Sequence, residues 1–195
     1  MCGRYVFFSD PEQAEISRIL QAIEAKGKAV RTGEIFPTNL APAVFYDVQL
    51  DCDAFMWGFP QYNRSGVLIN ARQETVLEKP TFKESFRSRR CALPASGYYE
   101  WDSAKQKLLF TRPQGGLLYL GGIYRPLEGA NRFVILTTAA SGAAADIHHR
   151  MPIVLDPEQV EGWCRDFDQA QAILQGPAPQ LVWAPAEAPR QMSLF

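Results

Sequence analysis

The second residue of the chain carries its most distinctive chemistry. A small residue such as Cys2 after the initiator Met1 favours removal of that methionine, and the mature chain would then begin with a free α-amine beside a thiol. With reference pKa values of about 8 and about 8.5, both groups are partly deprotonated at neutral pH. Such a 1,2-aminothiol condenses with an aldehyde, first to an imine and then to a five-membered thiazolidine. It can also act as a thiol nucleophile with its own amine as base. The alternative is a buried cysteine at the start of a strand.

Two further polar residues lie in apolar stretches of sequence. Asn70 follows three apolar residues at the end of a predicted strand, where its amide either caps a helix or orients a reacting group. Glu100 is the one carboxylate within residues 97–101, among two tyrosines and a tryptophan. Poor solvation among aromatic side chains favours a protonated carboxyl, which suits a general acid. Strand alternation could instead turn Glu100 toward solvent.

The only two histidines, His148 and His149, stand side by side before a predicted strand. A loop histidine in this position is a candidate general acid or base. Metal binding by the pair is the rival interpretation, but no other cluster of ligands accompanies it. The four cysteines are scattered without zinc-type spacing, which indicates reduced thiols and a cytoplasmic protein.

A basic segment spans residues 79–90, with Lys79 and Arg90 at its ends and two phenylalanines between them. Basic residues interleaved with aromatic ones suit a phosphate backbone with stacked bases. A solvated helix face with the two phenylalanines turned inward is the plainer explanation. Because the formal net charge is −1, any binding of nucleic acid must come from a local patch.

Short strands and few helices are predicted around these positions. Helices are expected from the Asp10-Pro11-Glu12-Gln13 start to about Gly27, from the identical Asp156-Pro157-Glu158-Gln159 start, and over 167–175. Strands are expected at residues 5–8, 44–50, 52–57, 67–69, 97–101, 107–112, 117–124, 132–138, 153–155 and 180–184, with a loop over 31–42. No apolar run is long enough for a membrane span and no secretory leader is evident. We expect one domain over residues 1–185, a flexible Pro/Ala-rich tail over 186–195, and a monomer.

Several separated stretches together resemble one family, the SRAP proteins, which process abasic sites in the SOS response. The match runs from residue 2 to about residue 165 and is carried by Met1-Cys2-Gly3-Arg4-Tyr5, Asn39-Leu40-Ala41-Pro42, Trp57-Gly58, residues 68–75, Phe82-Lys83, Arg90-Cys91, residues 97–101, Thr137 and residues 146–152.

The resemblance implies a compact α+β domain with a strongly bent, barrel-like antiparallel sheet flanked by short helices. It also implies that the protein binds single-stranded DNA at an abasic site and forms a thiazolidine crosslink to the ring-opened sugar, which shields the lesion. Cys2 matches the nucleophile, Asn70 the residue that orients it, Glu100 the carboxylate that assists ring opening, and His148 the proton-transferring histidine. No metal or other cofactor is needed.

Positions that match DNA contacts in the family, or that we add from the basic and aromatic pattern, are spread along the chain. They are Arg4, Asn39, Pro42, Arg72, Thr137, Tyr62, Lys79 and Arg90. Relatives often carry a Trp-Trp pair where this chain has Gln61-Tyr62-Asn63-Arg64, so Tyr62 would offer a smaller stacking surface.

The last five residues resemble the bacterial sliding-clamp-binding pentapeptide, with Gln191, Leu194 and Phe195 at its defining positions. A polar hook followed by Leu-Phe at a free end can dock in a hydrophobic groove; a frayed terminus is the alternative. Two other functions stay open for the whole chain. One is an N-terminal-cysteine peptidase that uses Cys2, Glu100 and His148, and the other is a non-covalent module that recognises a modified base.

Overall fold

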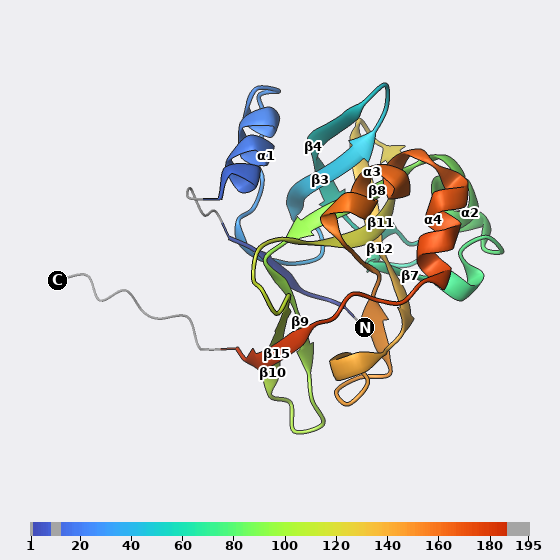
Figure 1. The fold of residues 1–195 in the computed structure, drawn as a ribbon. Helices are drawn as coiled ribbons and strands as arrows, with labels where there is room; N and C mark the ends of the chain where they lie inside the picture. Colours follow the sequence, from blue (N-terminus) through green and yellow to red (C-terminus); the bar gives the residue numbers. More distant parts are fainter. Residues whose placement is uncertain (1, 9–12, 187–195) are drawn as a thin grey trace.

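Five strands close into a barrel at the centre of the molecule (Figure 1). The computed structural model describes residues 2–8 and 13–186. The barrel strands are β3 (Leu40–Tyr46), β4 (Leu50–Trp57), β8 (Arg90–Ala95), β11 (Leu118–Leu127) and β12 (Ala130–Ala139). Strand β12 pairs with β11 on one side and, in parallel, with β4 on the other, which closes the ring. The predicted α+β class with a bent, barrel-like and largely antiparallel sheet is confirmed.

Three short strands extend the barrel by pairing with β11 or β12. They are β7 (Asn70–Arg72), which runs parallel to β12, β13 (Arg150–Pro152), which pairs with β12, and β14 (Val154–Leu155), which pairs with β11. A hairpin of β5 (Phe59–Pro60) and β6 (Val67–Leu68) leads from β4 into β7. As a result, β12 pairs both with β7, which begins at Asn70, and with β13, which begins at Arg150.

A second sheet has the order β15-β10-β9-β1-β2. Its strands are β1 (Tyr5–Phe7), β2 (Gly33–Ile35), β9 (Gly97–Trp101), β10 (Lys107–Thr111) and β15 (Val182–Pro185). Only Ser96 separates β8 of the barrel from β9 of this sheet, so one nearly continuous strand passes between the two. The N-terminal strand β1 pairs directly with β9. This junction places the residues before Tyr5 next to the barrel.

Helices cover the outside of the sheets: α1 (Ala14–Glu24), α2 (Pro80–Ser88), α3 (Val160–Arg165) and α4 (Phe167–Gln175), with 3-10 turns η1 (Gln73–Thr75), η2 (Gly142–Ala144) and η3 (Pro157–Gln159). The predicted apolar stripe of the first helix is buried at Ile16, Ile19 and Ile23. Of the repeated helix start, the second occurrence lies within the described residues. Residues 157–159 form a 3-10 turn with a complete Asp156–Gln159 capping box, and the α-helix begins only at Val160.

Strand β3 begins inside the stretch predicted as a loop. It starts at Leu40 and includes Pro42, which pairs with Ala54 of β4. Proline lacks an N–H, so it fits a strand only where one side needs no donor. That condition is met here, because the pairing of β3 with β8 starts at Val44, two residues further on.

Two predicted features fall outside the described residues. The first helix start, Asp10-Pro11-Glu12, lies in the 9–12 gap, and the tail motif lies beyond residue 186. The last described residue, Ala186, donates its backbone N–H to the carbonyl of Lys107 at 2.8 Å. Within residues 2–8 and 13–186, no helix is both long and apolar enough to cross a membrane.

Candidate active site

Cys2 is tied to the barrel through its own backbone. The side-chain amide of Asn70 donates from Nδ2 to the carbonyl oxygen of Cys2 at 3.1 Å, across 68 residues of sequence. The Cys2 side chain is fully buried, and its thiol points to the carbonyl oxygen of Arg4 at 3.9 Å. Asn70 therefore positions the nucleophile of the sequence prediction; the 3-10 turn that follows has Arg72, not Asn70, at its N-cap.

The thiol of Cys2 is held in its neutral form. Burial raises its pKa well above the ordinary value, and negative charge on the nearby Glu100 would raise that pKa further. Glu100 itself is only 5% exposed, in β9. It lies beside the N-terminal segment because the neighbouring Tyr99 N–H donates to the Arg4 carbonyl at 2.9 Å, which fixes β9 there. The Glu100 side chain therefore points inward and not toward solvent, and its role as a general acid stays a prediction.

Asn70 also offers an acceptor to the site. Its Oδ1 atom is buried and accepts no hydrogen bond from the described residues. A buried amide oxygen without a donor is costly, commonly about 1–3 kcal/mol, so such groups usually meet a donor when the site is occupied. An amine or a sugar hydroxyl would satisfy it.

His148 lies between the η2 turn and β13, with its ring orientation set by the backbone. The amide N–H of Arg150 donates to Nδ1 at 2.9 Å, and Nδ1 also lies 3.1 Å from the Arg150 carbonyl oxygen. Because the amide N–H can only donate, we assign Nδ1 as the acceptor, which leaves the proton of the neutral ring on Nε2. The ring stacks on His149 with centroids 4.3 Å apart. The Arg150 backbone thus fixes the orientation of the His148 ring, whose role in proton transfer stays a prediction.

Arg150 connects His148 to the strand that carries Asn70. Its guanidinium binds both carboxylate oxygens of Glu74, at 2.5 and 3.0 Å, and donates to the carbonyl of Thr137 at 2.6 Å. The Thr137 hydroxyl in turn lies 3.4 Å from the carbonyl of Ala71, next to Asn70. Sequence reasoning gave Arg150 and Glu74 no role, because 76 residues separate the two charges and nothing local signals their pairing.

The predicted DNA contacts divide into surface and internal positions. Tyr62 is 91% exposed on the β5–β6 hairpin, and Arg72 and Lys79 are also exposed. Arg4 is partly exposed, with its guanidinium stacked over the Phe36 ring at 4.2 Å.

Asn39 uses its side chain locally. Its Oδ1 accepts the N–H of Phe36 at 3.1 Å, which stabilises the turn before β3. The side chain is only half-buried, so this turn presents part of the residue to solvent.

Three predicted contact residues lie inside the protein instead. Arg90 is 2% exposed and donates to the carbonyls of Trp163, Phe86 and Arg87 at 2.6–2.7 Å. Thr137 is fully buried and Pro42 is buried in β3. Arg90 can be buried without a carboxylate because backbone carbonyls accept from its guanidinium. The DNA contacts predicted for Arg90, Thr137 and Pro42 stay predictions.

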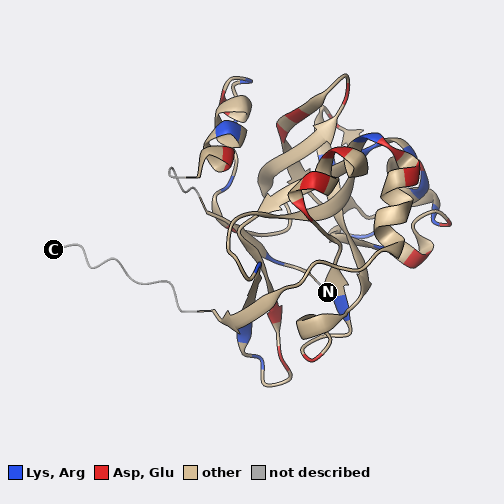
Figure 2. Cartoon of the chain, viewed as in Figure 1, with Lys and Arg blue, Asp and Glu red and all other residues tan. Residues whose placement is uncertain are grey.

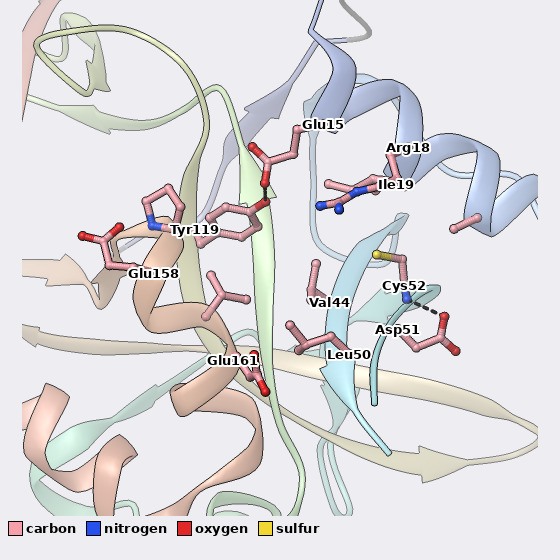
Figure 3. A pocket seen from close by; sticks show the side chains of 13 residues that line it. Glu15, Arg18, Ile19, Val44, Leu50, Asp51, Cys52, Tyr119, Glu158 and Glu161 are labelled. Atoms are coloured by element: carbon pink, nitrogen blue, oxygen red, sulfur yellow. Dashed lines mark hydrogen bonds between the residues drawn. The ribbon is translucent and has the colours of Figure 1, made fainter. Parts of the chain in front are cut away.

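A cavity of about 420 Å³ lies elsewhere, between α1, the β3–β4 hairpin and α3 (Figure 3). Tyr119 donates to Glu15 at 2.5 Å on its wall. None of the predicted site residues lines this cavity. This cavity is therefore separate from the predicted site around Cys2.

Comparison with known families decides the family of the chain. The family model described as SOS response associated peptidase (SRAP) matches residues 1–188. The chain belongs to the SRAP family. The predicted resemblance is confirmed, and Cys2, Asn70, Glu100 and His148 all lie within the matched part of this SRAP chain.

Curated relatives carry a name that describes a DNA lesion. The chain is 34% identical to the abasic site processing protein YobE of Bacillus subtilis, with 89% of this chain and 88% of the relative covered. It is 31% identical to the abasic site processing protein YedK of Escherichia coli, with 71% and 69% covered. A crystal structure of a Bordetella bronchiseptica protein superposes with a TM-score of 0.77 at 21% identity, over 96% of this chain and all of that one, which supports the fold.

Proposed function

We propose that this SRAP protein recognises abasic sites in single-stranded DNA and, after removal of Met1, crosslinks to them as a thiazolidine through Cys2. The arrangement that carries the proposal is Cys2 held by Asn70 beside a buried Glu100. The names of the curated relatives supply the lesion. The protein would act as a cytoplasmic monomer, and the reaction needs no metal or other cofactor.

The reaction begins with opening of the closed sugar. Glu100 donates a proton to the ring oxygen while His148 takes the proton of the C1 hydroxyl, which gives the aldehyde. The Cys2 amine then adds to C1, and His148 returns its proton to the departing hydroxyl, so that one water leaves and an iminium forms. Asn70 would hold the amine through the buried Oδ1 that meets no donor among the described residues.

Ring closure uses the thiol as a neutral group. The sulfur of Cys2 bonds to C1 of the iminium and its proton passes to Glu100, which became a carboxylate in the first step. Both Glu100 and His148 thereby return to their starting states. A high thiol pKa suits this order, because the amine attacks first and no free thiolate is required.

The same observation weighs against a peptidase. Cysteine peptidases depend on a thiolate with a depressed pKa, whereas burial raises the pKa of Cys2. Cleavage of a peptide in trans would therefore be weak. A module that binds DNA without a covalent bond would not require the buried Glu100 or the hydrogen bond from Asn70 to Cys2.

DNA would reach Cys2 over the surface that carries the exposed candidates. Arg72 and Lys79 provide phosphate partners, Tyr62 a stacking surface, and Arg4 and Asn39 flank the N-terminal segment. A set of contacts this local fits a chain whose formal net charge is −1.

The test is a crosslinking gel combined with intact mass. Untagged protein is mixed with a single-stranded oligonucleotide that carries one abasic site, and then denatured by heat and detergent. We expect a heat-stable adduct with the mass of protein minus Met1, plus DNA, minus one water. Cys2→Ala keeps the α-amine but lacks the thiol, so it should give an adduct only after borohydride reduction.

A variant extended at its N-terminus has no α-amine at Cys2 and should give no adduct at all. A heat-stable adduct of equal yield from Cys2→Ala, or none from wild type, would reject the proposal. Turnover of a peptide lost in Cys2→Ala would instead support the peptidase.

We also propose that Gln191, Leu194 and Phe195 tether the protein to a bacterial sliding clamp. These residues lie outside the described part of the chain, and the proposal rests on their sequence pattern. Deletion of residues 191–195 should abolish pull-down with the clamp and leave crosslinking intact. Pull-down that survives the deletion would contradict the tether.

A further inference from the structure

Two arginines face each other on neighbouring barrel strands. Arg125 of β11 and Arg132 of β12 are direct partners in the antiparallel register. Side chains at partnered positions lie on the same face of the sheet, with Cβ atoms about 5 Å apart, and like charges so placed repel each other. Since one neutral residue at either position would remove the repulsion, the pair calls for an explanation.

The repulsion is poorly compensated within the described residues. Arg132 has one carboxylate near it, that of Glu128 at 3.6 Å, and this side chain is 75% exposed. Arg125 forms no ion pair with a residue in the ranges 2–8 and 13–186. Arg112, which is also partly buried, has a closer counter-charge: it forms an ion pair with Asp156 at 2.8 Å.

Both guanidinium groups are also partly withdrawn from water. The side chain of Arg132 is 17% exposed, and the Nε atoms of both arginines are buried without an acceptor. Burial lowers the pKa of Arg125, and the charge of Arg132 lowers it further. The Arg125 guanidinium lies over the ring of Phe59, 4.4 Å from its centroid, which fixes its plane. The pair is thus preorganised and electrostatically unsatisfied.

The location of the pair connects it to the proposed DNA path. Phe59 opens the hairpin that leads to Asn70, and its ring centroid lies 6.2 Å from that of Phe82 in α2. Figure 2 marks the lysines and arginines along the chain in blue. Along β12, Arg132 precedes by three residues Ile135, the partner of Asn70. At about 3.3 Å per residue this separation is on the order of 10 Å along the strand. Because the offset is odd, the arginine pair lies on the sheet face opposite to that of Ile135 and Asn70.

We propose that Arg125 and Arg132 form a second phosphate-binding site, which holds the backbone of the DNA strand a few nucleotides away from the abasic sugar. A phosphate between the two guanidinium groups would replace their repulsion with charge-assisted hydrogen bonds. The identity of the strand rests on the proposed function, whereas the affinity for phosphate rests on the arginine pair alone.

The test compares the salt dependence of binding for wild type and Arg125→Gln/Arg132→Gln. The probes are a long single-stranded oligonucleotide and a trinucleotide, each with an abasic analogue that lacks the aldehyde. Each phosphate contact to a single strand contributes about 0.7 to the slope of log affinity against log salt concentration, so the double variant, which loses one phosphate site, should lose about 0.7 on the long probe. Between about 50 and 200 mM salt, wild type should therefore lose about 2.6-fold more affinity than the variant. The trinucleotide should bind both proteins equally.

Two controls separate a binding role from a structural one. Arg165→Gln removes an exposed arginine on α3 whose ion pair with Glu161 has a separation of 3.5 Å, and it should leave the slope unchanged. Thermal melting at low salt should show the double variant at least as stable as wild type, because the repulsion is gone. Inorganic phosphate should raise the melting temperature of wild type more than that of the variant. If the double variant fails to fold, Arg125→Gln alone should still reduce the slope on the long probe, by up to about 0.7.

The outcomes distinguish this inference from the proposed function. Wild type that crosslinks abasic DNA, with an unchanged slope in the double variant, would overturn the phosphate site and leave the function intact. A reduced slope on DNA without any crosslink would support the phosphate site and reject the function. A variant that melts lower and binds with the wild-type slope would show that the pair is structural, which also overturns the inference.

Discussion

Replacement of Glu74 by glutamine tests the connection between His148 and the strand of Asn70. Glu74→Gln keeps the shape of the side chain and removes its charge. Arg150, 9% exposed, then keeps its donors to Thr137 but loses the carboxylate that binds two of its nitrogens. The perturbation therefore leaves a largely buried guanidinium without a counter-charge.

The expected loss in the free energy of unfolding depends on how deeply each partner of the Arg150–Glu74 ion pair is buried. Removal of one partner from a fully buried ion pair costs about 3–5 kcal/mol. The Glu74 side chain is 46% exposed, so solvent screens part of the interaction and we expect about 2 kcal/mol. For a domain of this length, that loss lowers the melting temperature by about 4–8 °C.

The effect should depend on pH with a definite sign. The hydrogen bonds from Arg150 hold the pKa of Glu74 below its ordinary value. A carboxyl of this kind stabilises the fold above its unfolded-state pKa of about 4.3, and the stabilisation is lost as pH falls through the folded-state pKa. The difference in melting temperature between wild type and Glu74→Gln should be constant from about pH 8 to pH 5.5 and shrink below about pH 4.

Differential scanning fluorimetry over this pH range measures the effect. Glu161→Gln is the matched control, since its ion pair with Arg165 is exposed on both sides and should contribute less than about 0.5 kcal/mol. Equal melting of Glu74→Gln and wild type at neutral pH would refute the reasoning. So would a difference that persists unchanged at a pH where Glu74 is protonated in wild type.

Three further predictions follow from packing and hydrogen bonding. Gly122→Ala should lose about 1–3 kcal/mol in urea unfolding, because its Cβ would lie 2.7 Å from Leu93 and 3.0 Å from a carbonyl oxygen, whereas Gly176→Ala should change stability by less than about 1 kcal/mol. Arg90→Gln should lower the free energy of unfolding by about 3 kcal/mol because it orphans buried carbonyls, yet the salt slope of DNA binding should stay at the wild-type value; a reduced slope would restore Arg90 as a DNA contact. Asn70→Ala should slow thiazolidine formation about tenfold to hundredfold at saturating DNA, and an unchanged rate would remove the amide from the positioning of Cys2.

The residue types that carry the chemistry were readable from the sequence. An N-terminal cysteine after Met1, a carboxylate among aromatic residues and a histidine before a strand are local signals, because each depends on neighbours in the chain. The family resemblance followed from motifs in a fixed order, and the α+β class was implied by that resemblance and matched the many short strands. The apolar stripe of α1 was also local, since it repeats with the helical period.

Only the tertiary structure decided which of these side chains meet and in what state. The bond from Asn70 to Cys2 spans 68 residues and exists because β12 holds β7 beside the N-terminal segment. The neutral thiol of Cys2 depends on burial, the internal role of Arg90 on carbonyls from two helices, and the Arg125–Arg132 pair on strand register. Burial, pairing and register are properties of segments distant in sequence, so no local pattern encodes them, and they set both the proton chemistry and the distribution of charge at this site.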